Sequence, residues 1–307
     1  MANPLIQISV TKNFFIKISL LKIKEVKPMS RKRLTQMFPW LLPLRKRQRR
    51  LLFYLKMRFD KHRYSRTLAA DKNMPYQLFA SSCALYNHST GFSMTYQENK
   101  VFNLKLVAQQ MDGLLIYPGE TFSFWQLARY ADKKTPYKDG LTVENGKLTV
   151  SPGGGLCQMS NSLFWLFLHT PLTIIERHGH GIKEFPEPNS DEIKGVDATV
   201  AEGWLDLKVS NETDNTYQIR ISFDEENITT AIYTLYQPEL RYQVCNGPLR
   251  YWQQGDTIYE EIAVLRQAYS YANEQLVATE PLYTNQCIIT YPLPEGTVIA
   301  RKEPEHE

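Results

Sequence analysis

Cysteine is scarce in this chain, and the four cysteines form no recognisable motif. They lie at positions 83, 157, 245 and 287 of the 307 residues, and no two of them make a Cys-x-x-Cys pair. A zinc ribbon, which needs such pairs, is therefore not expected. Four cysteines over this length are also too few for a disulfide scaffold. The redox compartment stays open.

Long hydrophobic runs are also lacking. The two uncharged stretches longer than the roughly 18 residues of a membrane-spanning helix, 73–97 and 148–175, are broken up by polar residues and prolines, so no spanning helix is expected. Residues 4–23 are apolar, but three lysines interrupt them and no small-residue cleavage site follows, so they do not resemble a signal peptide. The residues alone therefore favour a cytoplasmic or peripheral membrane protein. Met29 would also serve as a start, in which case residues 1–28 would be an upstream extension outside the fold.

Acidic residues are almost missing from the first part of the chain. Residues 1–66 hold 18 Lys and Arg but two acids, whereas residues 67–307 hold 18 basic and 30 acidic residues. A basic arm thus precedes an acidic body, which favours contact with an anionic partner. Nucleic acid is not expected to be that partner, because nothing later in the chain resembles a nucleic-acid reading module.

The basic arm contains a predicted amphipathic helix that starts near Arg45. Its apolar stripe is formed by Leu51, Leu52, Leu55 and Phe59, with Arg and Lys on the other face. Within residues 31–66 this pattern allows two interpretations. The helix either lies on an anionic membrane surface or packs on the main domain.

The remaining chain predicts an α+β fold, with helices early and an antiparallel β-rich second half. We expect helices over residues 98–111 and 156–169 and a hairpin over 137–150 that turns at Asn145-Gly146. Strands are expected at residues 76–87, 172–180, 217–223, 228–236, 258–266 and 285–291, and two short strands are expected within 195–209 on either side of Glu202-Gly203. The predicted domains are a basic arm (1–66), a main domain (67–240) and a β-rich C-terminal extension (241–307).

The segment that could carry chemistry begins with Gly153-Gly154-Gly155 and opens a predicted helix. Glycines allow positive φ angles and the close approach of another group. The first turn of a helix has free N–H groups and a partial positive charge. Cys157 lies in that turn, so we expect a lowered thiol pKa and backbone donors for an oxyanion. Gln158 would add a side-chain donor.

A base and an orienting carboxylate follow further along the chain. His178 and His180 end a predicted strand, and their spacing places both rings on one face of it. Asp197 begins the next predicted strand. The order Cys157, His180, Asp197 is compatible with nucleophile, base and orienting group. Gly154, Gly155, Gln158 and His178 are predicted to line the binding site.

Other interpretations of these residues stay open. Cys157 could be an ordinary core residue of an apolar helix, and the histidines could be structural. Cys157, His178, His180 and Asp197 would also be an acceptable set of zinc ligands. Our preferred interpretation needs no metal and no cofactor.

Several segments together resemble the VanW family. They are PGETFSFW (118–125), the glycine run with Cys157-Gln158-Met159-Ser160, Arg-His-Gly-His (177–180) and Gly-Val-Asp-Ala-Thr-Val (195–200). The resemblance covers roughly residues 95–215 and implies a single VanW-type domain after the basic arm. It departs from the family at 177–181, where Arg-His-Gly-His-Gly replaces the usual Arg-His-Pro-His-Ser.

The resemblance implies an accessory role in vancomycin resistance. It also implies L,D-transpeptidase-like acyl transfer on peptidoglycan stem peptides, with Cys157 as the nucleophile and His180 as the base. It further implies a location facing the cell wall. The alternative is a non-catalytic module that binds a precursor or partner at the inner membrane face.

Overall fold

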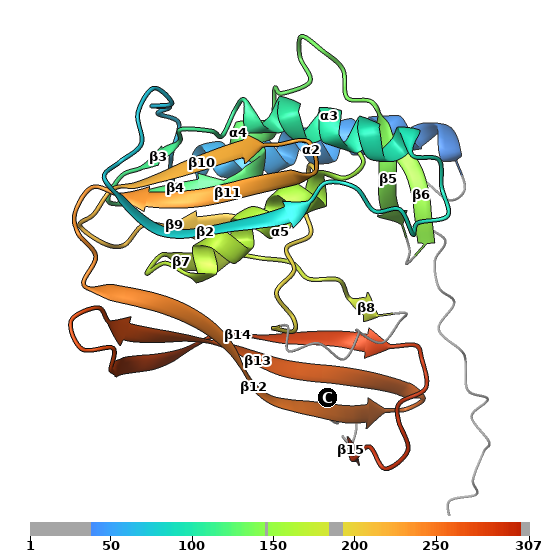
Figure 1. Cartoon of the computed structure of the whole chain (residues 1–307). Coiled ribbons are helices and arrows are strands. Elements are labelled where there is room, and N and C mark those ends of the chain that lie inside the picture. Colours follow the sequence, from blue (N-terminus) through green and yellow to red (C-terminus); the bar gives the residue numbers. More distant parts are fainter. Residues whose placement is uncertain (1–37, 145–146, 184–192, 302–307) are drawn as a thin grey trace, which may run out of the picture. The chain divides into compact units, whose positions relative to one another are not determined.

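The computed structural model describes residues 38–144, 147–183 and 193–301 (Figure 1). The chain divides into two compact units, Met1–Arg45 and Lys46–Glu307. In the first unit the described residues form the short helix η1 (Pro39–Leu41) and the beginning of α2 (Leu42–Phe59). Pro43 occupies the first turn of α2, where its missing N–H costs nothing. Everything that follows concerns the second unit.

The helices of the second unit are α2 from Lys46 onward, α3 (Thr95–Ala108), α4 (Phe124–Ala128) and α5 (Leu156–Leu168). Ser123 caps α4, since its Oγ accepts the N–H of Gln126 at 3.2 Å. The helices expected over 98–111 and 156–169 are both present, within three residues of the expected limits.

Two four-stranded sheets accompany these helices among the described residues. The first has the order β1-β4-β9-β7, made of β1 (Arg63–Tyr64), β4 (Glu120–Ser123), β9 (Lys208–Ser210) and β7 (Thr173–Glu176). The second has the order β2-β11-β10-β3 and is antiparallel, made of β2 (Tyr76–Ala84), β11 (Asn227–Thr234), β10 (Tyr217–Phe223) and β3 (Leu115–Ile116). β1 lies before the predicted boundary at residue 67 and pairs with β4 beyond it.

A third sheet and a hairpin complete the described fold. The sheet has the order β15-β12-β13-β14-β8, made of β15 (Ile299–Arg301), β12 (Leu240–Gln254), β13 (Thr257–Ser270), β14 (Leu276–Ile289) and β8 (Ile182–Lys183). The hairpin joins β5 (Asp139–Glu144) to β6 (Lys147–Pro152). The expected hairpin is thus confirmed, while the turn predicted at 145–146 lies outside the described residues. The α+β class with a β-rich second half is also confirmed.

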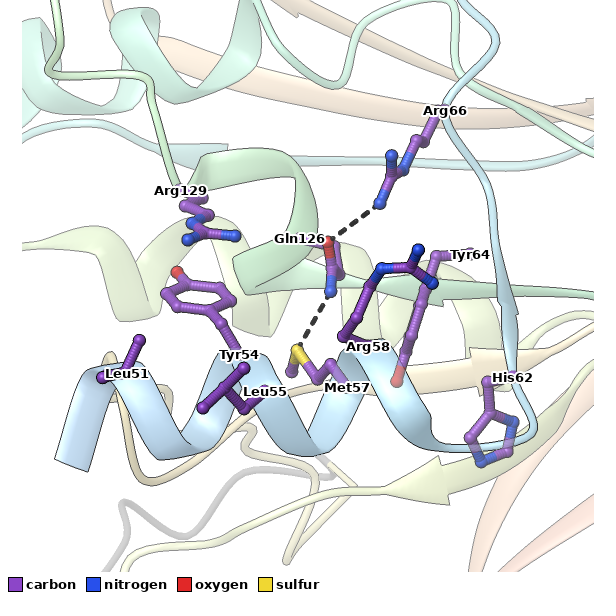
Figure 2. A pocket seen from close by; sticks show the side chains of 10 residues that line it. All are labelled: Leu51, Tyr54, Leu55, Met57, Arg58, His62, Tyr64, Arg66, Gln126 and Arg129. Carbon is purple, nitrogen blue, oxygen red and sulfur yellow. Dashed lines mark hydrogen bonds between the residues drawn. The ribbon is translucent and has the colours of Figure 1, made fainter. Parts of the chain in front are cut away.

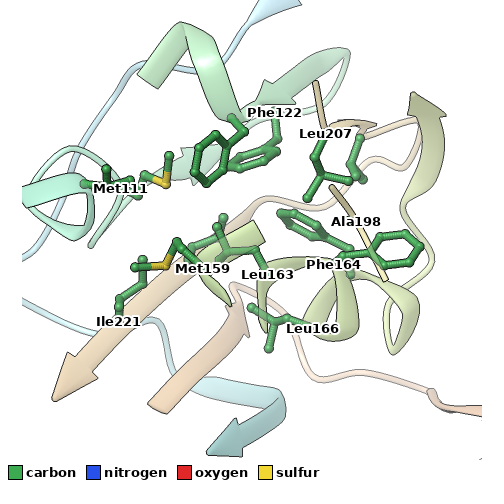
Figure 3. Packing of buried hydrophobic residues seen from close by; sticks show 14 of the residues in the cluster. Met111, Phe122, Met159, Leu163, Phe164, Leu166, Ala198, Leu207 and Ile221 are labelled. Atoms are coloured by element: carbon green, nitrogen blue, oxygen red, sulfur yellow. The ribbon is translucent and has the colours of Figure 1, made fainter. Parts of the chain in front are cut away.

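Helix α5 is buried among the first two sheets. Its apolar residues lie on several sides of the helix, as expected for a helix with neighbours all around, and it contacts β2 and β11. Figure 3 shows Met159, Leu163, Phe164 and Leu166 within this cluster. The rings of Phe122 and Phe167 lie 4.9 Å apart in the same core. This packing fixes the position of the first turn of α5, where Cys157 lies.

Two strand predictions are wrong in extent, and one strand was missed. The strand expected over 172–180 ends at Glu176, and most of 195–209 is irregular apart from β9 and an isolated bridge between Ala201 and Leu205. β12 was not predicted at all, because its sequence contains Gly247 and Pro248, which look like a loop. Both residues fall where the β12–β13 register shifts.

Within the described residues, no helix is both long enough and apolar enough to cross a bilayer.

Candidate functional site

The glycine run shapes the entry to α5. Gly153 and Gly155 have φ angles of +78° and +93°, and Gly155 is the N-cap of the helix. Gly154 packs on the backbone of Gly140 in β5, so closely that a Cβ atom at 154 would lie 2.1 Å from the Gly140 carbonyl oxygen. The glycines therefore provide both the positive φ angles and the close approach that the sequence predicted.

Cys157 is the second residue of α5 and is partly buried. Its thiol lies 3.8 Å from the carbonyl oxygen of Val200, to which it donates a hydrogen bond. Burial raises the pKa of the Cys157 thiol above its usual range. The expectation of a lowered pKa is therefore wrong for this state of the protein, because loss of solvation outweighs the favourable position at the helix start.

The irregular segment 195–200 is held against α5 by two small polar residues. Ser160 Oγ donates to the carbonyl oxygen of Ala198 at 2.6 Å, and Asn161 Oδ1 accepts the Ala198 N–H at 2.7 Å. These bonds place Thr199 and Val200 beside the first turn of α5. Sequence reasoning missed Ser160 and Asn161, although polar residues three and four positions after Cys157 on an apolar helix were a usable signal.

His180 and Asp197 form a tight pair. His180 Nδ1 lies 2.5 Å from Asp197 Oδ2, and the same oxygen accepts the His180 backbone N–H at 2.6 Å. Because an ionised carboxylate can only accept, Nδ1 must carry the proton and Nε2 is left as the basic nitrogen. The hydrogen bond to Asp197 raises the pKa of His180. This is the orientation that the predicted base and orienting group require.

Arg177 fixes the other side of Asp197. Its Nη2 lies 2.5 Å from Asp197 Oδ1, and its Nη1 donates to Asn285 Oδ1 on β14 at 2.8 Å. Burial of Asp197 opposes ionisation, but the hydrogen bond from His180 and the charge of Arg177 together hold the pKa of Asp197 below its usual range. Sequence reasoning assigned no role to Arg177 or to Asn285, which is far away in the chain.

His178 is directed elsewhere. It lies beyond the end of β7, and its Nε2 is 3.0 Å from Glu176 Oε1. The prediction that both histidines share one face of a strand is therefore wrong, because the strand has ended before either residue. His178 and Glu176 form a separate pair that Lys208 extends, with its Nζ 2.9 Å from Glu176 Oε2.

A cavity of about 1200 Å³ is lined by four of the predicted site residues, whereas Gly154, His178 and Asp197 are not part of its wall. Its wall contains Gly155, Cys157, Gln158 and His180, together with residues of β2 and the β5–β6 hairpin. Within the described part of the chain, no hydrogen bond joins the Cys157 thiol to the His180 ring. The side chain of His180 is 47% exposed, and its ring bonds to Asp197 and not to the sulfur.

Gln158 faces the cavity, but its amide nitrogen is already engaged. Nε2 donates to the carbonyl oxygen of Ala84 at 2.7 Å and lies 3.4 Å from the sulfur of Cys83. The predicted role of Gln158 as a free donor is thus not available in this arrangement. The N–H of Gln158 is also engaged, since it donates to the Gly155 carbonyl oxygen at 3.0 Å. The donors left at the start of α5 are then the backbone N–H groups that precede it in the first turn.

The zinc alternative finds no support among the residues that the structure describes. No group of three His, Cys, Asp or Glu side chains there is arranged to hold a metal ion. Asp197 is already held by His180 and Arg177, while His178 belongs to the Glu176 pair.

Comparison with known proteins assigns this chain to a family. The description "VanW like protein" applies to residues 99–233, a range that contains Cys157, His180 and Asp197. The chain is 59% identical over 271 residues to the vancomycin B-type resistance protein VanW of Enterococcus faecalis, which covers 88% of this chain and 98% of the relative. This chain belongs to the VanW family.

A more distant relative shares part of the chain. The uncharacterized protein YoaR of Bacillus subtilis is 30% identical over 155 residues, which is 50% of this chain and 46% of that protein. No solved structure matches the chain. The site described above is therefore interpreted from its own geometry.

Proposed function

We propose that this VanW-family chain contributes to vancomycin resistance as a cysteine-dependent, L,D-transpeptidase-like acyl transferase on peptidoglycan stem peptides. One observation carries the proposal: Cys157 and the Asp197-bound ring of His180 line the same cavity. A thiol, an imidazole with Nε2 as its basic nitrogen, and an orienting carboxylate are the groups that cysteine acyl transfer uses. The Thr199 hydroxyl lies 3.5 Å from that nitrogen.

The reaction would proceed in two balanced steps. In the first, His180 Nε2 takes the thiol proton while the Cys157 sulfur attacks an amide carbonyl of the donor stem. The C–N bond then breaks, the leaving amine takes the proton from His180, and a thioester remains on Cys157. In the second, an amine of the acceptor stem gives its proton to His180 and attacks the thioester, which restores the thiol. Backbone N–H groups at the start of α5 would stabilise both oxyanions.

The resistance role rests on the similarity and on a chemical argument. The Enterococcus faecalis relative is described as a vancomycin B-type resistance protein. Cross-links of the L,D type do not use the terminal D-alanyl group that vancomycin grips. An enzyme that makes them would therefore keep the wall cross-linked while that group is blocked.

The test compares muropeptides from a vancomycin-challenged host that expresses the wild-type chain or Cys157→Ala. Cys245→Ala is the matched control, because Cys245 lies on β12 outside the cavity. We expect new cross-links with the wild type and the control but not with Cys157→Ala. Mass spectrometry of the purified chain with a donor stem peptide should also show an acyl adduct on Cys157. Identical cross-link profiles for all three chains would contradict the proposal.

A second candidate function is a non-catalytic module that binds a wall precursor or partner in the same cavity at the inner membrane face. The raised pKa of Cys157 and the absence of a described bond between its thiol and His180 favour it. The two functions differ in one measurement. If the chain is a binding module, Cys157→Ala should keep both its affinity for a stem peptide and its protection of the host. If the chain is a transferase, Cys157→Ala should keep the affinity but lose the protection.

A further inference from the structure

The apolar stripe of α2 faces solvent in the second unit. Leu51, Leu55 and Phe59 lie four residues apart on one side of the helix, and they are 59%, 41% and 82% exposed. The buried residues of α2 are instead Tyr54 and Met57. Helix α2 thus packs on the domain through Tyr54 and Met57, as one of the two interpretations expected, while its apolar stripe stays exposed and leaves the membrane interpretation open.

A second cavity, of about 340 Å³, opens beside this stripe. Figure 2 shows Arg58 on α2, Arg66 on the following segment and Arg129 at the end of α4, all in its wall. Leu51 and Leu55 belong both to the stripe and to this wall. We call it the α2 cavity. It is separate from the Cys157 cavity and shares no lining residue with it.

The α2 cavity is strongly cationic. His62 joins the three arginines in its wall, and no Asp or Glu is among the described lining residues. Arg58 makes no ion pair or hydrogen bond with any described residue, and Arg66 makes only a 3.4 Å contact with Gln126 Oε1. The guanidinium of Arg129 stacks on the Tyr54 ring at 3.8 Å, which leaves its N–H groups free to bind an anion.

The acids nearest to this cavity are already engaged. Asp60 accepts the hydroxyl of Tyr64 at 2.6 Å, and Glu202 accepts the hydroxyl of Tyr54 at 2.8 Å. Glu202 also pairs with Arg50 at 3.1 Å. The formal charge of Glu202 is thus paired with Arg50, while Asp60 at the edge of the cavity offsets only part of the charge of the three arginines.

We propose that the α2 cavity binds the phosphate of an anionic phospholipid headgroup, with Leu51, Leu55 and Phe59 inserted at the acyl boundary of the bilayer. Guanidinium groups bind phosphate oxygens through paired N–H donors. A cationic site bordered by an exposed apolar stripe matches a lipid, which presents a phosphate and hydrocarbon side by side. Residues 1–37 of the chain are a poor alternative occupant, because they carry eight Lys and Arg and one acid.

The test measures binding of the full chain to vesicles of phosphatidylglycerol and phosphatidylcholine against vesicles of phosphatidylcholine alone. We expect binding only to the anionic vesicles. The variant Arg58→Gln/Arg66→Gln should weaken it roughly 30-fold, as two basic contacts at a membrane surface would. The matched control Lys72→Gln/Arg250→Gln removes the same charge at exposed positions outside the cavity and should bind within about threefold of the wild type, since distant charges are screened.

Two further arms distinguish a lipid from a free phosphate. The variant Leu55→Ser/Phe59→Ser should lose vesicle binding but keep its affinity for soluble glycerol phosphate, measured by calorimetry. Far-ultraviolet circular dichroism checks that each variant is folded. Equal weakening by the arginine pair and its control would overturn the proposal. Vesicle binding that survives the stripe variant would also overturn it, because the stripe would then not be inserted. Binding of glycerol phosphate without binding of anionic vesicles would overturn it in favour of a free phosphate ligand. Neither result depends on whether Cys157 is catalytic.

Discussion

Each oxygen of the Asp197 carboxylate has a different partner: His180 Nδ1 lies 2.5 Å from Oδ2, and Arg177 Nη2 lies 2.5 Å from Oδ1. The orientation of His180 therefore depends on Arg177, although the two side chains make no recorded contact. The predictions that follow separate the parts of this arrangement.

Replacing Asp197 by Asn should impair His180 as a base. The hydrogen bond to the carboxylate raises the pKa of His180, so Asp197→Asn should return that pKa towards its usual value. We expect acyl transfer to fall about 10²–10⁴-fold, the usual contribution of general acid–base catalysis. Nuclear magnetic resonance titration of the His180 ring gives the pKa directly. Asp214→Asn, at an exposed acid, is the control and should change neither quantity.

Replacing Arg177 by Gln should affect stability and the His180 pKa together. Arg177 is 9% exposed and holds Asp197 and Asn285, so its loss should lower the free energy of unfolding by about 3–5 kcal/mol. The charge of Arg177 also lowers the pKa of His180, so the variant should raise that pKa. Urea denaturation and ring titration measure the two effects. Arg241→Gln breaks an exposed pair with Glu274 and should cost at most about 1 kcal/mol.

The contribution of the His180–Asp197 pair to stability should depend on pH. Because the folded pKa of His180 is raised above 6.5, the folded state binds the proton more tightly than the unfolded chain does. The stabilisation is present in full below pH 6.5 and is lost as the pH rises through the raised value. Thermal unfolding of the wild type and His180→Gln should therefore differ more at pH 5.5 than at pH 9. If the difference between the wild type and His180→Gln instead grows towards pH 9, the pair does not stabilise the fold through a raised His180 pKa.

Labelling of Cys157 by a small thiol reagent should require a higher pH in the native chain than in the same chain unfolded in urea. Burial disfavours the thiolate in the folded state and raises the pKa of Cys157. Mass spectrometry of the Cys157 peptide gives the pH midpoint in each state. A lower midpoint in the folded chain would mean that the position at the helix start, and not burial, determines the direction in which the pKa of the Cys157 thiol shifts. A stem peptide that lowers the native midpoint would indicate that substrate brings His180 to the sulfur.

Gly154→Ala should destabilise the fold by about 2–4 kcal/mol, because the added Cβ atom meets the backbone of Gly140. Since both partners are backbone, neither can move without shifting α5 or β5. Gly181→Ala is the matched control, as a Cβ atom there has nothing within 4 Å. Urea denaturation of both variants measures the difference. Equal stability would mean that the contact between β5 and the start of α5 can relax.

The parts of the site that sequence could predict depend on local patterns. The three glycines before an apolar run of helical length gave the start of α5 and the place of Cys157. Asp197 and His180 were predicted from their order and residue types, and the structure pairs them. That pairing is a contact over 17 positions, which local patterns do not determine.

The parts that sequence missed depend on contacts distant in the chain. Arg177 is held by Asn285, which lies 108 positions away on β14. The pKa of Cys157 was expected to fall from its helix position, but burial against the segment of Val200 reverses the direction. The direction of His178 was missed because β7 ends two residues before it. Each error concerns packing between segments, about which the residue pattern carries little information.

The bond between Arg177 and Asn285 has a consequence for proteolysis. Asn285 belongs to the last sheet of the chain, whereas Cys157 and His180 lie well before it. A protease that cuts between β11 and β14 would remove Asn285 while leaving every predicted catalytic residue in place. Arg177 would then lose its bond to Asn285. The cut chain would keep Cys157 and His180 but would no longer hold them in the same relative positions.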